Sequence, residues 1–157
     1  MHDTHKYDAL TLALIDLVGM LNSPRQDDIL LAEAGAVLDR ALFPLLVRIG
    51  ASNVLNVADL AEQVGRDHST VSRQTAKLEA LGLIRRRAGK ADGRAREAVI
   101  TAKGRRLVQA ITKARRRLFD RLLAGWSVAD VQALARLNRK LAEAMRNARD
   151  SSQSGRR

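Results

Sequence analysis

The chain has 157 residues and a formal net charge of +11, and 46% of its residues are hydrophobic but only 3% aromatic. This composition suits one domain of ordinary size with a core of Leu, Val, Ile and Ala. Long Leu-, Ala- and Arg-rich stretches with only two prolines favour a mainly helical protein. The absence of cysteine excludes disulfides, thiolate metal sites and thiol redox switches.

The N-terminal residues lack the basic-then-apolar order of a signal peptide, and no apolar run reaches the roughly 20 residues that span a bilayer. We therefore expect a cytoplasmic protein. The positive charge lies in one stretch, because residues 85–121 hold 14 Lys and Arg against three Asp and Glu, and the two signs cancel elsewhere. Such a block indicates a polyanionic partner, although the solvated face of an arginine-rich helix has the same composition.

Three helices are predicted in the N-terminal third of the chain. An apolar stripe at helical spacing predicts an amphipathic helix over about residues 8–21. A shorter helix covers about 27–34, and the next covers 38–49, where Gly50 closes it. Pro44 weighs against the third helix, since an interior proline lacks a hydrogen-bond donor and clashes with the preceding turn.

Two short helices joined by a glycine turn follow. Asn56 is a good N-cap for a helix over about 57–64, and Gly65 supplies the turn. Asp67 is the next N-cap, and it begins a helix from His68 to about residue 81. This arrangement is typical of a helix-turn-helix, in which the second helix enters the major groove of DNA.

A β-hairpin and two long helices complete the chain. Gly82 ends the second short helix, and residues 83–87 and 98–101 are predicted to form two strands with a long polar loop between them. Helices are predicted over about 102–123 and 127–146, the second with Ser127 as its N-cap.

The second short helix has two chemically different sides. Val71, Thr75 and Leu78 lie at core-facing spacing. The other side presents polar side chains, of which the short hydroxyls suit phosphate, Arg73 suits guanine and Gln74 suits adenine. These DNA-facing residues are Ser69, Thr70, Ser72, Arg73, Gln74 and Lys77. The basic hairpin makes the unit a winged one whose arginines could reach an adjacent minor groove.

Arg85, Arg86 and Arg87 alternate sides of their strand, so they cannot all face DNA, and one or two of them are expected to contact phosphate. The arginines of the following long helix are expected to cover a solvated face, and a membrane-bound basic helix is a weaker interpretation because it leaves the winged motif unexplained.

The segment 56–104 resembles the DNA-binding core of the MarR family of bacterial regulators. The matching motifs are Ser69-Thr70-Val71-Ser72-Arg73, then Leu78-Glu79-Ala80-Leu81-Gly82-Leu83-Ile84-Arg85-Arg86, then Asp92-Gly93-Arg94-Ala95-Arg96, then Ile100-Thr101-Ala102-Lys103-Gly104. Ile100 stands where the family usually has Leu, and the motifs cover about a third of the chain.

The resemblance implies a mainly α fold with a small β-hairpin wing (α+β), that is, a winged helix-turn-helix with N- and C-terminal dimerisation helices. It implies a homodimer that binds a palindromic operator in double-stranded DNA. Arg94 at the wing tip would enter the minor groove, oriented by a salt bridge from Asp92, and the wing's DNA contacts would be Arg86, Arg94 and Arg96.

The expected organisation has four parts. Residues 1–36 form an N-terminal helical dimerisation segment, 37–103 the winged DNA-binding lobe, 104–148 the C-terminal dimerisation helices and 149–157 a disordered tail. The apolar faces of the flanking helices are too extensive for a lone DNA-binding unit, which favours subunit contacts.

We predict a transcriptional regulator, more specifically a repressor released by a small-molecule effector. The resemblance places that effector near residues 10–21, 38–49 and 105–115. Two alternatives stay open: a non-specific architectural nucleic-acid-binding protein, and a helical protein-interaction module. His2, His5 and His68 form no metal-ligand pattern, no catalytic grouping has motif context, and no enzyme activity, cofactor or metal is expected.

Overall fold

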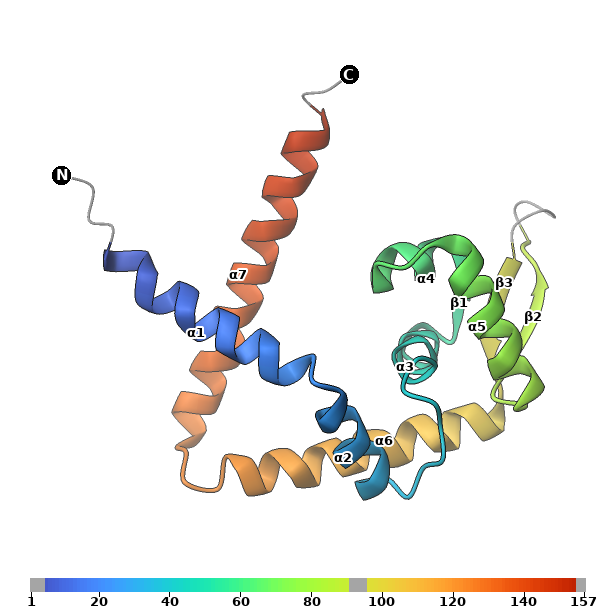
Figure 1. Cartoon of the computed structure of the whole chain (residues 1–157), viewed down its shortest axis with the longest axis horizontal. Coiled ribbons are helices and arrows are strands. Elements are labelled where there is room, and N and C mark those ends of the chain that lie inside the picture. Colours follow the sequence, from blue (N-terminus) through green and yellow to red (C-terminus); the bar gives the residue numbers. More distant parts are fainter. Residues whose placement is uncertain (1–4, 91–95, 155–157) are drawn as a thin grey trace. The chain divides into compact units, whose positions relative to one another are not determined.

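The computed structural model describes residues 5–90 and 96–154 of a mainly α-helical chain with a small antiparallel sheet (Figure 1). The chain divides into two compact units, Met1–Arg116 and Arg117–Arg157, which are taken in turn. Within the described residues, every helix is too short or too polar to cross a bilayer.

The first unit begins with three helices: α1 (His5–Leu21), α2 (Pro24–Glu33) and α3 (Phe43–Ser52). The predicted third helix, over 38–49, was placed too early. Pro44 lies in the first turn of α3, where a residue without an N–H leaves no intrahelical hydrogen bond unmade, so the helix starts beside the proline. Pro24 begins α2 for the same reason, earlier than predicted.

Gly50 does not close α3, as the sequence suggested, but lies inside it. A Cβ at Gly50 would meet the Val108 and Ile100 side chains at 3.0–3.2 Å. The glycine therefore allows α3 to approach these neighbours closely, and the helix continues to Ser52. Asn53 follows with a φ of 61°, which turns the chain into the first strand.

The helix-turn-helix is confirmed as α4 (Val57–Val64) and α5 (His68–Ala80). The Asn56 side chain accepts a hydrogen bond from the Ala58 N–H at 2.8 Å, and Asp67 accepts from the Thr70 N–H at 2.8 Å. Gly65, between the helices, and Gly82, after α5, have φ of 65° and 71°, which a residue with a Cβ rarely adopts.

The sheet has three strands, β1 (Val54–Asn56), β2 (Ile84–Ala88) and β3 (Arg96–Ile100), in the order β1-β3-β2. The wing hairpin predicted from the sequence is the β2–β3 pair, with Ile84 opposite Ile100. The prediction missed β1, whose three residues are too few to show an alternating pattern. Its pairing with β3 attaches the wing to the chain segment between α3 and α4.

The core of the first unit lies between α3, α4, α5 and the sheet, which Figure 1 shows grouped together. Leu45, Leu46 and Ile49 of α3, Leu60 of α4 and Leu78 of α5 are fully buried there. Aliphatic side chains of β2, β3 and the residue before β2 close it from the other side, as the low aromatic content predicted; they are Leu83, Ile84, Ala98 and Ile100.

Helix α6 (Ala102–Leu122) begins at a close contact with the chain before β2. The Thr101 hydroxyl lies 2.7 Å from the Gly82 carbonyl oxygen and accepts the Gly104 N–H at 3.0 Å. Gly104 is buried, and a Cβ there would lie 2.0 Å from the Leu83 carbonyl oxygen. The start of α6 thus requires a residue without a side chain.

The second unit contains the end of α6 and helix α7 (Val128–Ser154). Ser127 is its N-cap, as predicted: its hydroxyl accepts the Asp130 N–H at 3.1 Å and donates to the Asp130 carboxylate at 2.6 Å. The helix continues past the predicted end at residue 146, because no glycine or proline interrupts the sequence before Gly155. Residues 151–154, part of the expected disordered tail, are helical, whereas 155–157 lie outside the described residues.

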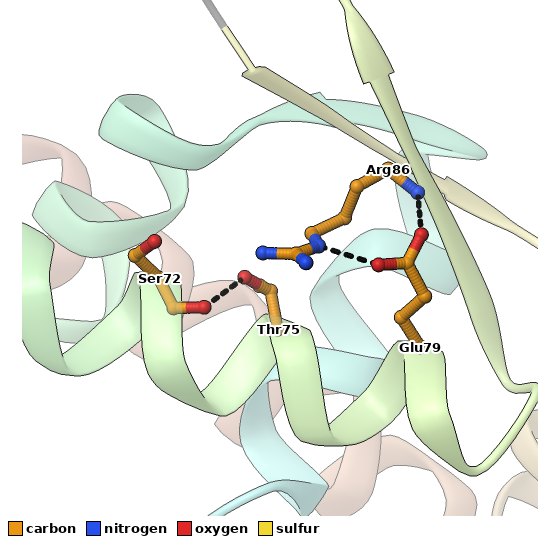
Figure 2. Close-up of polar contacts among 4 residues, drawn as sticks. All are labelled: Ser72, Thr75, Glu79 and Arg86. Atoms are coloured by element: carbon orange, nitrogen blue, oxygen red, sulfur yellow. Dashed lines mark hydrogen bonds and ion pairs between the residues drawn. The ribbon is translucent and has the colours of Figure 1, made fainter.

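The wing is fastened to α5 by Glu79. Its carboxylate accepts the Arg86 backbone N–H at 2.8 Å and the Arg86 side-chain Nε–H at 2.7 Å (Figure 2). These hydrogen bonds, the backbone one first, hold the pKa of Glu79 below its ordinary value. The two side chains are 35% and 26% exposed, so the pair is partly screened by solvent. A side chain of α5 is thereby hydrogen-bonded to the backbone of the wing.

Gly104→Ala should destabilise the protein by about 1–3 kcal/mol, because the new Cβ would overlap the Leu83 carbonyl oxygen. Urea unfolding followed by circular dichroism measures this change. Gly125→Ala is the matched control, since nothing lies within 4 Å of a Cβ there. Equal stability of the two variants would contradict the described contact at the start of α6.

Glu79→Gln should lower the free energy of unfolding at pH 7 by about 1 kcal/mol, since the amide keeps only one of the two oxygens that accept from Arg86 and the charge is lost. A lowered pKa adds stability above the unfolded value of about 4.3, and this is lost as the pH falls through the folded value. The difference from the wild type should therefore shrink below about pH 4. Glu143→Gln, at an exposed position of α7, is the control.

Candidate nucleic-acid interface

The two sides of α5 differ in burial as the sequence predicted. Val71, Thr75 and Leu78 are 0% exposed and face the core, where the Thr75 hydroxyl donates to the Ser72 carbonyl at 2.9 Å (Figure 2). Arg73 and Lys77, one turn apart on the opposite side, are exposed. The predicted DNA-facing set therefore divides into exposed residues, Ser69, Arg73 and Lys77, and half-buried ones, Thr70, Ser72 and Gln74.

The first turn of α5 is organised around the Asp67 carboxylate. The Ser69 hydroxyl donates to Asp67 Oδ1 at 2.5 Å, and the Thr70 hydroxyl donates to Asp67 Oδ2 at 2.5 Å. These bonds, with that from the Thr70 N–H, hold the pKa of Asp67 well below its usual range, so the carboxylate stays ionised. Both hydroxyl protons are thus already committed within the protein.

Arg73 is restrained by the same network. Its Nη2 donates to the Thr70 hydroxyl oxygen at 3.3 Å, which leaves the other donors of the guanidinium facing outward from an exposed side chain. The positions one turn beyond Arg73 and Lys77 on this side, Ala76 and Ala80, carry only methyl groups. The side chains of Ala76 and Ala80 project little beyond the backbone of α5, whereas those of Arg73 and Lys77 are long and cationic.

Gln74 lies at the flank of α5 and is held by Arg66 from the turn before the helix. Arg66 Nη1 donates to the Gln74 side-chain oxygen at 2.9 Å and to the Ala41 carbonyl oxygen at 2.7 Å. Because a guanidinium has donors only, the atom of Gln74 that faces it must be the amide oxygen. The amide NH₂ is the part of Gln74 that remains for another partner.

The wing arginines alternate between the two faces of the hairpin, as predicted. Arg86 lies opposite buried Ala98 and turns toward α5, where Glu79 binds it. Arg85 and Arg87 lie on the other face, and Arg87 donates to the Glu97 carboxylate at 2.9 Å. Arg96 is exposed at the start of β3, whereas Arg94 and Asp92 lie outside the described residues.

Sequence reasoning missed the partners that restrain these side chains. An Asp followed two and three residues later by hydroxyls is a recognisable local signal, and it would have shown that Asp67 takes the protons of Ser69 and Thr70. Arg66 and Glu79 gave no such signal, because their partners at Ala41, Gln74 and Arg86 are defined only by tertiary contacts.

Elsewhere in the first unit, a cavity of about 590 Å³ lies between α2 and the chain leading to α3. Apolar side chains form most of its lining, including Leu31, Leu38 and Leu42, and Asp28 and Asp39 supply carboxylates. It shares Leu38, Asp39 and Leu42 with the region expected for an effector, but no residue of 10–21 or 105–115 lines it. The described residues include no group of three or more His, Asp or Glu side chains placed to hold a metal ion.

Solved structures with this fold are numerous. A MarR family protein from Bacillus stearothermophilus has a TM-score of 0.78 at 19% identity, with 92% of this chain and 99% of that one covered. NadR, solved in complex with 4-hydroxyphenylacetate, has a TM-score of 0.67 at 21% identity over 90% of this chain and 98% of NadR. At these identities the likeness establishes the winged helix-turn-helix fold.

The sequence itself carries the relationship further. The model of the MarR family matches residues 38–95, which run from the chain before α3 into the wing. An uncharacterized HTH-type transcriptional regulator of Bacillus subtilis (strain 168), YxaD, is 33% identical over 107 residues, which cover 68% of this chain and 75% of YxaD. With a helix-turn-helix whose outer side is polar and basic, the chain belongs to the MarR family of DNA-binding transcriptional regulators.

Proposed function

We propose that the protein is a homodimeric, sequence-specific repressor that dissociates from its operator when it binds a small-molecule effector. The observation that carries the proposal is the division of α5: its apolar side is fully buried, so its other side must present Arg73 and Lys77 to solvent. A helix held in this way, followed by a basic hairpin, has the geometry to enter a major groove.

Exposed apolar side chains on the flanking helices support the homodimer. Contiguous apolar surface of this kind marks an interface. A second copy of the chain is the partner that a symmetric operator requires. On α1 these residues are Leu10, Leu12, Ile15, Leu17, Val18, Met20 and Leu21, and on α7 they are Val128, Leu134, Leu137 and Met145.

Repression would follow from occupancy of promoter DNA by the dimer, which blocks the polymerase. An effector would act by favouring a dimer whose two α5 helices no longer match half-sites about 34 Å apart. The NadR complex with 4-hydroxyphenylacetate supports a small-molecule effector in this fold. The cavity between α2 and the chain before α3 is our candidate for its site.

The residues that we assign to DNA contact keep distinct roles. Arg73 and Gln74 face base edges, and Lys77 contacts a phosphate. Arg94, oriented by Asp92, enters the minor groove from the wing tip. The remaining members of the proposed interface are Ser69 and Thr70, in the first turn of α5, and Ser72, Arg86 and Arg96, which position the protein on the backbone.

Selection of bound sequences from a random DNA pool with the purified protein tests this proposal. A two-fold symmetric consensus, and binding that survives a large excess of random DNA by a factor of about 10³, would support it. The +11 charge would also suit a non-specific architectural binder, which predicts no consensus. If the protein binds no DNA at any salt concentration, the result would point to a protein-interaction module instead.

Arg73→Ala should weaken operator binding by about 1–3 kcal/mol and relax the preference at one base position in each half-site. Lys77→Ala should weaken binding to all sequences alike and reduce the slope of log affinity against log salt by about one. Fluorescence anisotropy at several salt concentrations separates the two effects. Identical behaviour of both variants would remove Arg73 from base reading.

Gln74 should read a base acceptor through its NH₂ group, because Arg66 already donates to its oxygen and the guanidinium lies beside that atom. The paired contact with adenine, which we expected from the residue type, needs that oxygen to accept the adenine N6–H. Arg66→Met should free it and shift the selected base toward adenine, and the shift should vanish in the Arg66→Met, Gln74→Ala double variant. An unchanged base preference in Arg66→Met would contradict this assignment.

A further inference from the structure

We propose that Asp67 is a specificity-determining residue, whose carboxylate prevents the first turn of α5 from binding DNA phosphates indiscriminately. This inference rests on the DNA-binding role of α5 given above, and it assigns to Asp67 a role beyond capping the helix. The first turn of a helix offers free N–H groups and a positive dipole end, which together attract an anion. In a recognition helix such a site would attract any phosphate, whatever the base sequence.

The geometry shows that this position is filled from within. Asp67 accepts the Thr70 N–H at 2.8 Å, so one of the free donors of the first turn is already satisfied. It also takes the hydroxyl protons of Ser69 and Thr70, each at 2.5 Å. Three donors that could have held a phosphate oxygen are therefore bound to a fixed negative charge.

Two consequences follow for a bound duplex. The ionised carboxylate, which is exposed beside the DNA-facing side of α5, repels a phosphate that approaches the start of the helix. The Ser69 hydroxyl, whose proton is held by Asp67, can only accept from a ligand, and it would accept from an amino group of cytosine or adenine in the major groove, whereas the Thr70 oxygen already accepts from Arg73. The first turn is thus converted from a phosphate holder into a reader of base donors.

Asp67→Asn separates this role from helix capping. Asparagine is as good an N-cap as aspartate, so its side-chain oxygen can still accept the Thr70 N–H. The substitution removes the charge and replaces Oδ2 by an NH₂ group, which releases the Thr70 hydroxyl proton for a phosphate, whereas Ser69 can still donate to the remaining oxygen. The melting temperature of Asp67→Asn should therefore fall less than that of Asp67→Ala, which loses the cap as well as the charge.

The experiment measures the binding of the full-length wild type and of Asp67→Asn to a random-sequence duplex and to the selected operator, by fluorescence anisotropy over a range of salt. We expect Asp67→Asn to bind the random duplex roughly 3- to 10-fold more tightly at low salt, with a salt slope steeper by about 0.9 for one added phosphate contact. The ratio of operator to random affinity should fall. Asp120→Asn, an exposed position on α6, makes the same change in net charge and should do none of this.

The outcomes are distinguishable. If Asp67→Asn and Asp120→Asn change the random-duplex affinity and the salt slope equally, Asp67 acts only through net charge and the inference is wrong. An unchanged ratio of operator to random affinity in Asp67→Asn would also overturn it. If the wild type binds no duplex at all, the proposed function fails first, and this inference fails with it.

Discussion

The burial of one side of α5 is the constraint on which the remaining features depend. Val71, Thr75 and Leu78 are completely enclosed by α3, α4 and the sheet, and this fixes the rotation of the helix about its axis. Rotation by one residue would expose a leucine and bury a charged group, at a cost of several kcal/mol. The direction of Arg73 and Lys77 is therefore set by the core and needs no contact with DNA to establish it.

The side chains around that rigid helix compete for a limited number of hydrogen-bond donors and acceptors. Asp67 accepts hydrogen bonds from two hydroxyl groups, and Arg66 donates to the side-chain oxygen of Gln74. Glu79 accepts from Arg86. Each of these bonds decides which atoms are left to face a ligand. Residue type alone suggested that Gln74 would pair with adenine, and the arrangement around it points instead to its donor group.

Much of the fold follows from the sequence because its signals are local. The caps at Asn56, Asp67 and Ser127 and the turn at Gly65 were predicted correctly, since each satisfies the backbone of the helix next to it. The errors came where contacts with residues far away in the sequence determine the local structure. Gly50 looked like a helix end, but its lack of a side chain serves the packing of Val108 and Ile100.

For the candidate site, too, the features set by local sequence signals could be predicted, and those set by contacts between distant residues could not. The outward face of α5 could be predicted from periodicity, because the buried positions repeat at helical spacing. The pairing of Arg86 with Glu79 could not be predicted, since the residues lie on different elements and an arginine or a glutamate can be exposed to solvent without such a partner. The start of α3 was also predicted too early, because Pro44 was taken as an interior residue and lies in the first turn.

The bond between Glu79 and the backbone of β2 has a mechanical consequence. A hairpin held only at its base could swing on its own, but this one is clamped to the helix partway along its first strand. Helix α5 and the hairpin should therefore move as one rigid unit. In the complex with DNA that we propose, the spacing between the contacts of α5 and those of the wing would therefore be fixed within the lobe.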